Sequence, residues 1–127
     1  MGASSAGFHE DASKLSAETQ DMHRAIVSLM EELEAVDWYQ QRVDAAGDDE
    51  LRAILAHNRD EEIEHASMVL EWLRRRNPTF AENLGTYLDT TGPITAVETA
   101  ATGSGAGGAP AGGGDGSLGI GSLKGSK

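Results

Sequence analysis

The 127-residue chain contains no cysteine. Disulfide bonds, thiolate metal sites and cysteine nucleophiles are therefore excluded. Any metal ion bound by side chains has to rely on carboxylate and imidazole groups, and this donor set suits iron, manganese or zinc. The absence of one residue type thus restricts the metal chemistry before any motif is considered.

Basic residues are also scarce, because 10 lysines and arginines stand against 21 aspartates and glutamates, and the formal net charge is −11. Such an acidic chain repels nucleic-acid phosphates and attracts cations. Long apolar runs are missing as well, so no segment reaches the length of a membrane span. Residues 1–7 lack the apolar core of a signal peptide, and Ala6 stands where a myristoylation motif requires serine or threonine. We expect a cytoplasmic protein that binds neither nucleic acid nor membrane.

The remaining sequence is dominated by helical periodicity. One segment extends from a cap at Ser13 or Ser16 to the break at Gly47, with no glycine or proline inside it. Its apolar residues recur every three or four positions, as on one face of a helix: Met22, Ile26, Leu29, Leu33, Val36 and Val43. Asp48 can then cap a second helix, which extends to about Arg76.

A shorter helix follows the second one. Asn77 and Pro78 stop the long helix and can start a third, which ends near Gly92. We therefore predict an all-α fold, a two-helix antiparallel hairpin plus a short C-terminal helix. Each long helix covers only one side of the other, so two copies are expected to complete a four-helix bundle by homodimerisation.

The composition changes sharply towards the C-terminal end. We predict a disordered N-terminal segment (1–12), a helical domain (13–97), a flexible glycine-rich linker (98–116) and a disordered tail (117–127). The tail carries three aliphatic residues that have no local core to enter, namely Leu118, Ile120 and Leu123. A random tail and a tethered docking peptide both fit this pattern.

The second long helix carries two polar residues where apolar ones are expected. At about 100° per residue, Glu62 and His65 share one narrow arc with four aliphatic residues, Leu51, Leu55, Val69 and Leu73. An unpaired charge on such a face is unfavourable. A cation bound by both side chains removes this cost, and residues at i and i+3 are close enough to share one ion. A Glu-x-x-His pair on a solvated surface is the ordinary alternative, but its position within the apolar arc favours metal ligation.

The first long helix supplies a further carboxylate. Glu32 lies at the margin of the apolar face, roughly as far before Gly47 as Glu62 lies after it, so an antiparallel hairpin brings the two level. Ferritin-like di-iron sites use two helices that each give a glutamate and two that each give Glu-x-x-His. One chain carries half of this set, and a two-fold axis would supply the other half. Tyr39 lies two turns beyond Glu32 on the same margin.

Three segments resemble the encapsulated ferritins, bacterial half-ferritins that are packaged inside encapsulin nanocompartments. They are residues 31–39 (EELEAVDWY), 54–65 (ILAHNRDEEIEH) and 71–75 (EWLRR). Residues 116–124 (GSLGIGSLK) resemble the peptide by which such cargo proteins bind the inner wall of the shell. The resemblance covers about residues 20–97 and the tail.

The resemblance implies a ferroxidase, which oxidises Fe(II) with O₂ at a di-iron centre on a subunit interface. The residues of this centre would be Glu32, Glu62 and His65, with Tyr39 as a hydrogen-bonding neighbour. A ring-like homodecamer built from dimers would deliver the iron for storage inside an encapsulin compartment. Residues 117–127 would form an encapsulin-targeting peptide, in which Leu118, Ile120 and Leu123 bind the shell.

The resemblance also implies two additional metal sites, with calcium, manganese or zinc as candidate ions. A secondary site where iron enters would use Glu31, Glu34 and Trp38. A peripheral site would use His57, Glu61 and Glu64. Without the resemblance, a solvated acidic face explains the first set, and an ordinary surface pair explains the second equally well.

Two other functions stay open at this point. Another dimetal enzyme, such as an oxygenase or a peroxidase, could use the same helical bundle. A non-enzymatic assembly module could use bound metal only to stabilise its dimer, while the tail organises partners. Rapid O₂ consumption after the addition of Fe(II) would distinguish a ferroxidase from both.

Overall fold

The computed structural model describes residues 6–107 of the chain, and these residues form helices and no strand, which confirms the all-α prediction. The 3-10 helix η1 (Ala12–Lys14) precedes four α-helices, α2 (Ala17–Ala45), α3 (Asp49–Arg76), α4 (Pro78–Tyr87) and α5 (Ile94–Gly107). The predicted tail (117–127), with Leu118, Ile120 and Leu123, lies outside the described residues. None of the described helices is long and apolar enough to cross a membrane.

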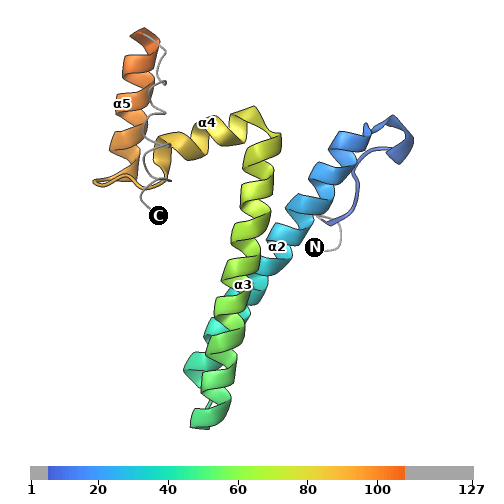
Figure 1. Ribbon diagram of the computed structural model, residues 1–127, viewed down its shortest axis with the longest axis vertical. Coiled ribbons are helices and arrows are strands. Elements are labelled where there is room, and N and C mark those ends of the chain that lie inside the picture. The colour runs from blue at the N-terminus through green and yellow to red at the C-terminus, as the bar shows by residue number, and fades with distance from the viewer. Residues whose placement is uncertain (1–5, 108–127) are drawn as a thin grey trace. The chain divides into compact units, whose positions relative to one another are not determined.

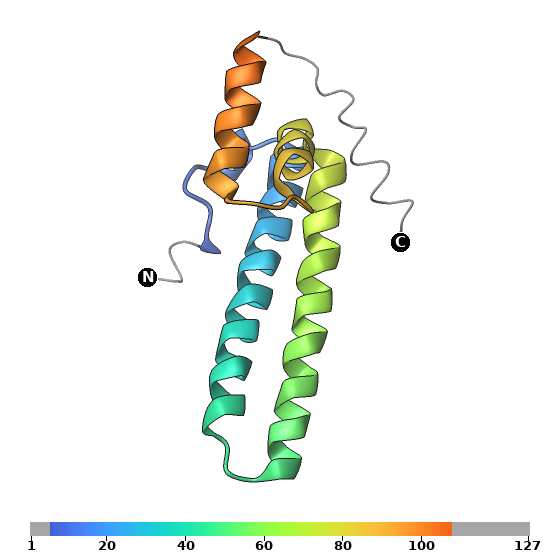
Figure 2. The same ribbon diagram turned by 90° about the vertical axis from the view of Figure 1, so that its left-hand side faces the viewer.

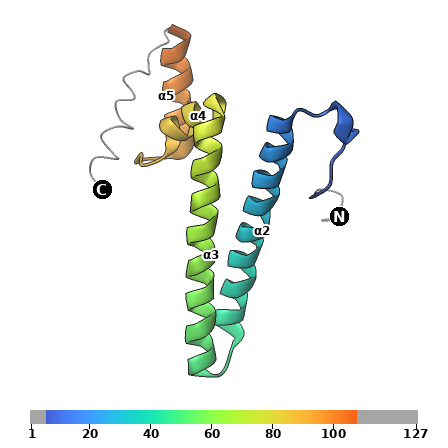
Figure 3. The same ribbon diagram turned by 45° about the vertical axis from the view of Figure 1, so that its right-hand side comes forward.

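The chain divides into two units, residues 1–73 and 74–127. The first unit is built on the antiparallel hairpin of α2 and α3 (Figure 1). Figure 2 shows the two helices running side by side from the turn between them, and Figure 3 shows that they separate with distance from that turn. The predicted hairpin is thus present, and its far end is open.

Capping side chains begin the helices where the sequence predicts. Ser16 begins α2, Asp48 begins α3 and Asn77 begins α4, and each side-chain oxygen accepts the backbone N–H of the residue three positions later at 2.8–3.0 Å. Each bond satisfies an N–H group that has no partner within the helix. Of the two caps predicted for the first helix, Ser16 is the one used.

The hairpin has a very small core. Among the described residues, only Ala66 and Leu73 are buried apolar side chains. On α2, the residues Ile26, Met30 and Leu33 are 38%, 41% and 55% exposed, and their spacing puts them on one face of the helix. On α3, several more large apolar side chains are exposed, namely Leu51, Ile54, Ile63 and Met68. Apolar side chains gathered on a face, rather than scattered singly, mark an interaction surface.

The N-terminal segment differs from the prediction, because the described part of residues 1–12 is tied to α2. The rings of Phe8 and His23 lie with their centroids 4.5 Å apart. Asp11 accepts hydrogen bonds from the backbone N–H and the hydroxyl of Ser13 and so starts η1. Gln20 of α2 donates to the carbonyl groups of Ala12 and Leu15. Ring packing and local hydrogen bonds therefore replace the disorder expected from its small polar residues.

Helix α5 is the second difference from the prediction, in which the flexible linker starts at residue 98. The carbonyl of Pro93 accepts the N–H groups of Ala96 and Val97, which starts the helix, and no glycine or proline follows until Gly103. Ala100 and Ala101 precede Gly103, and alanine is the strongest helix former. These alanines favour continuation of the helix into the linker predicted from residue 98. The predicted boundary at residue 98 is therefore wrong, since α5 continues through Gly107.

The second unit contains α4 and α5, which contact each other. Between these helices, Asp89 and Gly92 have φ angles of 63° and 83°. These angles lie in the left-handed region, which glycine and aspartate adopt more easily than most residues and which allows the chain to turn. The end of the third helix before Gly92 is thus confirmed.

Arg52 connects the two long helices at their turn. Its guanidinium donates to the carbonyls of Val43 and Ala46 at the C-terminal end of α2, and it pairs with Asp49 at 2.7 Å. Carbonyl groups in the last turn of a helix lack helical partners, so a cation that reaches them from the next helix holds the hairpin closed.

The substitution Arg52→Ala is expected to lower the free energy of unfolding by about 1–3 kcal/mol, because hydrogen bonds from a charged group are lost. Urea or thermal unfolding at matched protein concentration measures this change. Arg24→Ala is the control, since Arg24 pairs with Asp21 on an exposed face, and loss of such a pair costs less than about 1 kcal/mol. Equal destabilisation by the two substitutions would contradict the role given to Arg52.

Candidate metal centre

Glu32, Glu62 and His65 form a group of three side chains that could hold a metal ion, and no second group of this kind occurs among residues 6–101. One ligand atom from each residue lies within 4.8 Å of the other two. The Nδ1 atom of His65 is 3.5 Å from Oε1 of Glu62 and 3.6 Å from Oε1 of Glu32. The structure thus brings together, from two helices, the three residues that the sequence analysis selects as ligands.

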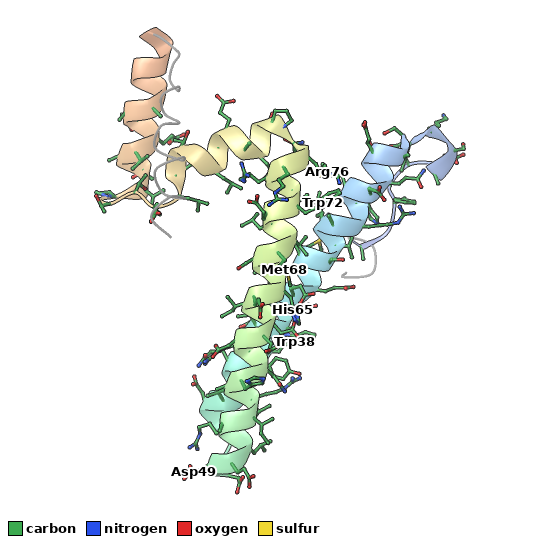
Figure 4. The ribbon with its side chains drawn as sticks, viewed as in Figure 1. Trp38, Asp49, His65, Met68, Trp72 and Arg76 are labelled. Carbon is green, nitrogen blue, oxygen red and sulfur yellow. The ribbon has the colours of Figure 1, made fainter. Side chains whose placement is uncertain are left out.

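Both long helices are needed to form this cluster. Figure 4 shows His65 near the middle of α3, in the part of the helix that crosses α2 in this view. Closer to the turn, Nη1 of Arg59 donates to Oε1 of Gln40 at 2.7 Å, a hydrogen bond from α3 to α2. Together with Arg52 at the turn, this bond fixes the pairing of the helices that brings Glu32 level with Glu62 and His65.

The two carboxylates of the cluster interact with each other. A side-chain hydrogen bond with Glu62 raises the pKa of Glu32, partial burial and the negative charge of Glu62 raise it further, and His65 opposes the shift. The pKa is raised because two close carboxylates repel each other when both are ionised, so the negative charge on Glu32 is less favourable beside Glu62. A bound cation would offset this repulsion.

The spacing of the three donor atoms fits a metal ion. An ion with nitrogen and oxygen ligands at about 2.0–2.2 Å separates neighbouring ligand atoms by about 3 Å. The distances from His65 to the two carboxylates are 3.5 and 3.6 Å, so small side-chain rotations would bring all three donors onto one ion. Two carboxylates and one imidazole suit iron, manganese or zinc.

The cluster is open to one side. The side chains of Glu32, Glu62 and His65 are 26%, 25% and 42% exposed. Three protein ligands leave coordination positions free for water, for substrate oxygen or for ligands from another chain. One hairpin therefore forms a partial metal site rather than a closed one.

Tyr39 lies on the same helix as Glu32 but outside the ligand cluster. Its ring is half-buried, and the guanidinium of Arg42 stacks over it at 5.3 Å from the ring centroid. A hydrogen bond from the Tyr39 hydroxyl to a ligand carboxylate stays a prediction.

The residues selected for the secondary site lie at the surface of α2. Glu31 and Glu34 are exposed, and Trp38 is 49% exposed. Their spacing puts them on one face of the helix, a turn apart. They do not form a ligand cluster of the kind seen at Glu32, in the part of the chain that the structure describes. Metal binding there stays a prediction.

The residues selected for the peripheral site lie on α3. Nε2 of His57 is 3.6 Å from Oε2 of Glu61, in an exposed i,i+4 pair. With Glu64, they do not meet the same cluster criterion within the described residues. Metal binding at this site also stays a prediction.

Glu61 has a second contact that the sequence analysis misses. Its Oε1 atom lies 3.9 Å from Nε2 of His65, on the side of the imidazole that faces away from Glu32 and Glu62. Glu61 and His65 are four residues apart on a helix, and this spacing alone could have indicated the contact.

The raised pKa of Glu32 predicts how the stability of the metal-free protein changes with pH. Because the folded state holds the proton more tightly than the unfolded state, protonation stabilises the fold at low pH, and this contribution is lost as the pH rises through the folded pKa. Glu32→Gln removes the repulsion with Glu62. We expect it to leave the metal-free protein up to about 1 kcal/mol more stable than wild type near neutral pH, the usual size for a solvent-accessible charge pair.

This stability difference should shrink as the pH is lowered through the raised pKa of Glu32, because a protonated Glu32 resembles glutamine. Urea unfolding of chelator-treated protein at several pH values measures it. Glu82→Gln, at an exposed carboxylate of α4, is the control for loss of one charge. A Glu32→Gln protein that is less stable at every pH would contradict the repulsive pair.

Comparison with known proteins agrees with the helical architecture. Residues 7–91 match the EncFtn-like family. The chain is 65% identical to the "Encapsulated ferritin-like protein" of Rhodospirillum rubrum over 130 aligned positions, which cover 98% of this chain and 93% of the relative. It is 53% identical to the "Ferritin-like protein" of Thermotoga maritima over 96 positions, covering 76% and 84% of the two chains.

A more distant relative and a solved structure extend the comparison. The "Encapsulin nanocompartment cargo protein EncC" of Myxococcus xanthus is 30% identical over 123 positions, covering 92% of this chain and 95% of the relative. The crystal structure of protein ne0167 from Nitrosomonas europaea superposes with a TM-score of 0.68 at 64% identity, and covers 69% of this chain and 97% of that one.

The family match spans most of the described residues and includes both long helices with the Glu32, Glu62 and His65 cluster. Identity of 65% over nearly the whole chain is far above what a shared fold alone would produce. The chain therefore belongs to the EncFtn-like family of encapsulated ferritins.

Proposed function

We propose that this protein is a ferroxidase, which oxidises Fe(II) to Fe(III) with O₂ at a di-iron centre formed across a subunit interface. The observation that carries the proposal is the cluster of Glu32, Glu62 and His65 on an open face of the hairpin. Two carboxylates that favour a shared cation, beside an imidazole, form a donor set for iron. Membership of the encapsulated ferritins supports iron as the metal.

The partial ligand set supports a homodimer. Ferritin-like di-iron sites use four helices, and α2 and α3 supply one glutamate helix and one Glu-x-x-His helix. A two-fold axis through the open face would add the same three ligands from a second copy and hold two irons about 3.5–4 Å apart. The exposed apolar side chains of α2 and α3 would be buried in the same step, completing a four-helix bundle.

The chemistry divides between substrate and protein. Fe(II) is the substrate, and each of two irons gives one electron to O₂. The carboxylates of Glu32 and Glu62 hold the cations and favour the higher charge of Fe(III), because oxygen anions are hard ligands. His65 completes the set, and Tyr39 would orient a ligand carboxylate through its hydroxyl.

The additional acidic sites would guide iron to this centre. Glu31, Glu34 and Trp38 lie at the surface of α2, where an incoming cation is accessible from solvent. His57 and Glu61, with Glu64, would form the peripheral site on α3. The net charge of −11 favours the approach of cations to both. Calcium, manganese or zinc would compete with iron at these exposed positions.

We further propose that the protein forms a decameric ring of dimers and stores iron inside an encapsulin nanocompartment. The Rhodospirillum rubrum relative is named as encapsulated and the Myxococcus xanthus relative as an encapsulin cargo protein, which supports packaging of this chain as well. Leu118, Ile120 and Leu123 would provide the binding energy for the shell, at about 1.5–3 kcal/mol for each side chain that becomes fully buried.

The ligand cluster is tested by Glu32→Ala, Glu62→Ala and His65→Ala. Each substitution is expected to lower the rate of Fe(II) oxidation at least about tenfold, because a metal ligand is removed. Absorbance after addition of Fe(II) in the presence of O₂, together with O₂ consumption, measures the rate. Glu82→Ala removes an exposed carboxylate of α4 and should keep the wild-type rate. Wild-type kinetics in all three ligand variants would refute the di-iron centre.

The packaging proposal is tested by deletion of residues 118–127. We expect the truncated protein to keep its ferroxidase rate but to be absent from co-expressed encapsulin shells, since its three aliphatic anchors are gone. Purification of the shells and quantification of cargo measures the loading. Lys124→Ala is the control and should load normally, because a charge at the rim of an interface contributes little. Normal loading of the truncated protein would show that packaging depends on the helical body.

A further inference from the structure

His65 has carboxylates on both sides of its ring. Its Nδ1 atom faces Glu62 at 3.5 Å and Glu32 at 3.6 Å, while its Nε2 atom faces Glu61 at 3.9 Å. Glu32 reaches the ring from α2, and the two other carboxylates belong to α3, the helix of His65 itself. Figure 4 shows this ring near the middle of the hairpin.

A neutral imidazole has one nitrogen that carries a proton and one with a free electron pair. A metal binds the electron pair, so the proton has to reside on the other nitrogen, and an acceptor beside that nitrogen fixes the orientation of the ring. In His65, Nδ1 points between the two candidate ligand carboxylates. The proton of the metal-binding form therefore belongs on Nε2, opposite Glu61.

We propose that Glu61 is a positioning residue for His65: its carboxylate accepts the Nε2–H group and directs Nδ1 towards the metal between Glu32 and Glu62. This inference rests on the proposed metal centre. It gives Glu61 a second role beside that of a peripheral ligand, since Oε1 of Glu61 faces His65 while Oε2 faces His57 at 3.6 Å.

The 3.9 Å separation is longer than a hydrogen bond, but the side chain of Glu61 is 48% exposed and can rotate. Rotation about its own bonds would bring the carboxylate towards Nε2 without movement of the helix. The positions on α3 fit this role, because residues four apart lie one turn above each other on the same face.

The test compares Glu61→Leu with Glu61→Gln in a His57→Ala background, which removes the peripheral pair from every sample. Glutamine keeps a side-chain oxygen that accepts Nε2–H but loses the charge, whereas leucine loses both. The probe is Zn(II), which is redox-inert and diamagnetic, and its binding is measured by competition with a chelator. His65→Ala in the same background identifies the part of the binding that belongs to the centre.

We expect Glu61→Leu to weaken Zn(II) binding about 10–100-fold, as is usual when the partner of a metal-bound histidine is removed. Glu61→Gln should stay within about threefold of the parent protein. Nitrogen-15 spectra of Zn(II)-loaded protein should show His65 protonated on Nε2 in the parent and in Glu61→Gln. Glu82→Leu is the control for loss of a carboxylate elsewhere and should leave binding unchanged.

Three results would overturn the positioning role. Equal weakening by glutamine and leucine would mean that Glu61 acts through its charge alone, and unchanged binding in Glu61→Leu would mean that it does not act on His65. Zn(II) binding that is insensitive to His65→Ala would refute the metal centre and this inference together. If the wild-type protein binds Zn(II) in a His65-dependent way but does not oxidise Fe(II), only the ferroxidase proposal is refuted.

Discussion

The close pair of carboxylates, Glu32 and Glu62, is the interaction on which the candidate site depends. Their proximity raises the pKa of Glu32, so the pair is unfavourable when both groups are ionised and no cation is present. A protein that keeps such a pair on a partly apolar helix face gives up some metal-free stability. The cost is reversed when a cation binds, because binding to the folded state alone stabilises it by mass action. Metal affinity and fold stability are therefore linked through one contact.

The small core of the hairpin makes the same surface important for association. Only Ala66 and Leu73 are buried among the described apolar residues, and α2 exposes a face formed by Ile26, Met30 and Leu33. Two helices cannot bury more, because each covers one side of the other. In the proposed dimer, the partial ligand set and these apolar side chains would be completed by one partner in one step. Dimer formation and metal binding would then favour each other.

Much of the helical part could be predicted from the sequence, because local signals fix its helix ends. Ser16, Asp48 and Asn77 cap helices through their own side chains. The equal distances of Glu32 and Glu62 from the Gly47 turn predict that these two side chains meet.

The hydrogen bond from Arg59 to Gln40 and the ring packing of Phe8 on His23 depend on the tertiary arrangement, so no local pattern predicts them. Helix α5 was missed because its glycines suggest a linker, while the alanines before Gly103 favour a helix. The contact of Glu61 with His65 could have been predicted from the sequence, because the two residues have i,i+4 spacing on a helix.

The architecture also bears on where oxidised iron would go. A ferritin that stores its own mineral needs a closed shell of subunits around a cavity. Here the candidate centre lies on an open hairpin face, and the proposed dimer would cover this face and close the site without enclosing space for mineral. Oxidation and storage would therefore have to be separated, with Fe(III) released from the centre into a container built by another protein. In this proposal, the apolar residues of the tail would keep the ferroxidase inside the compartment that stores its product.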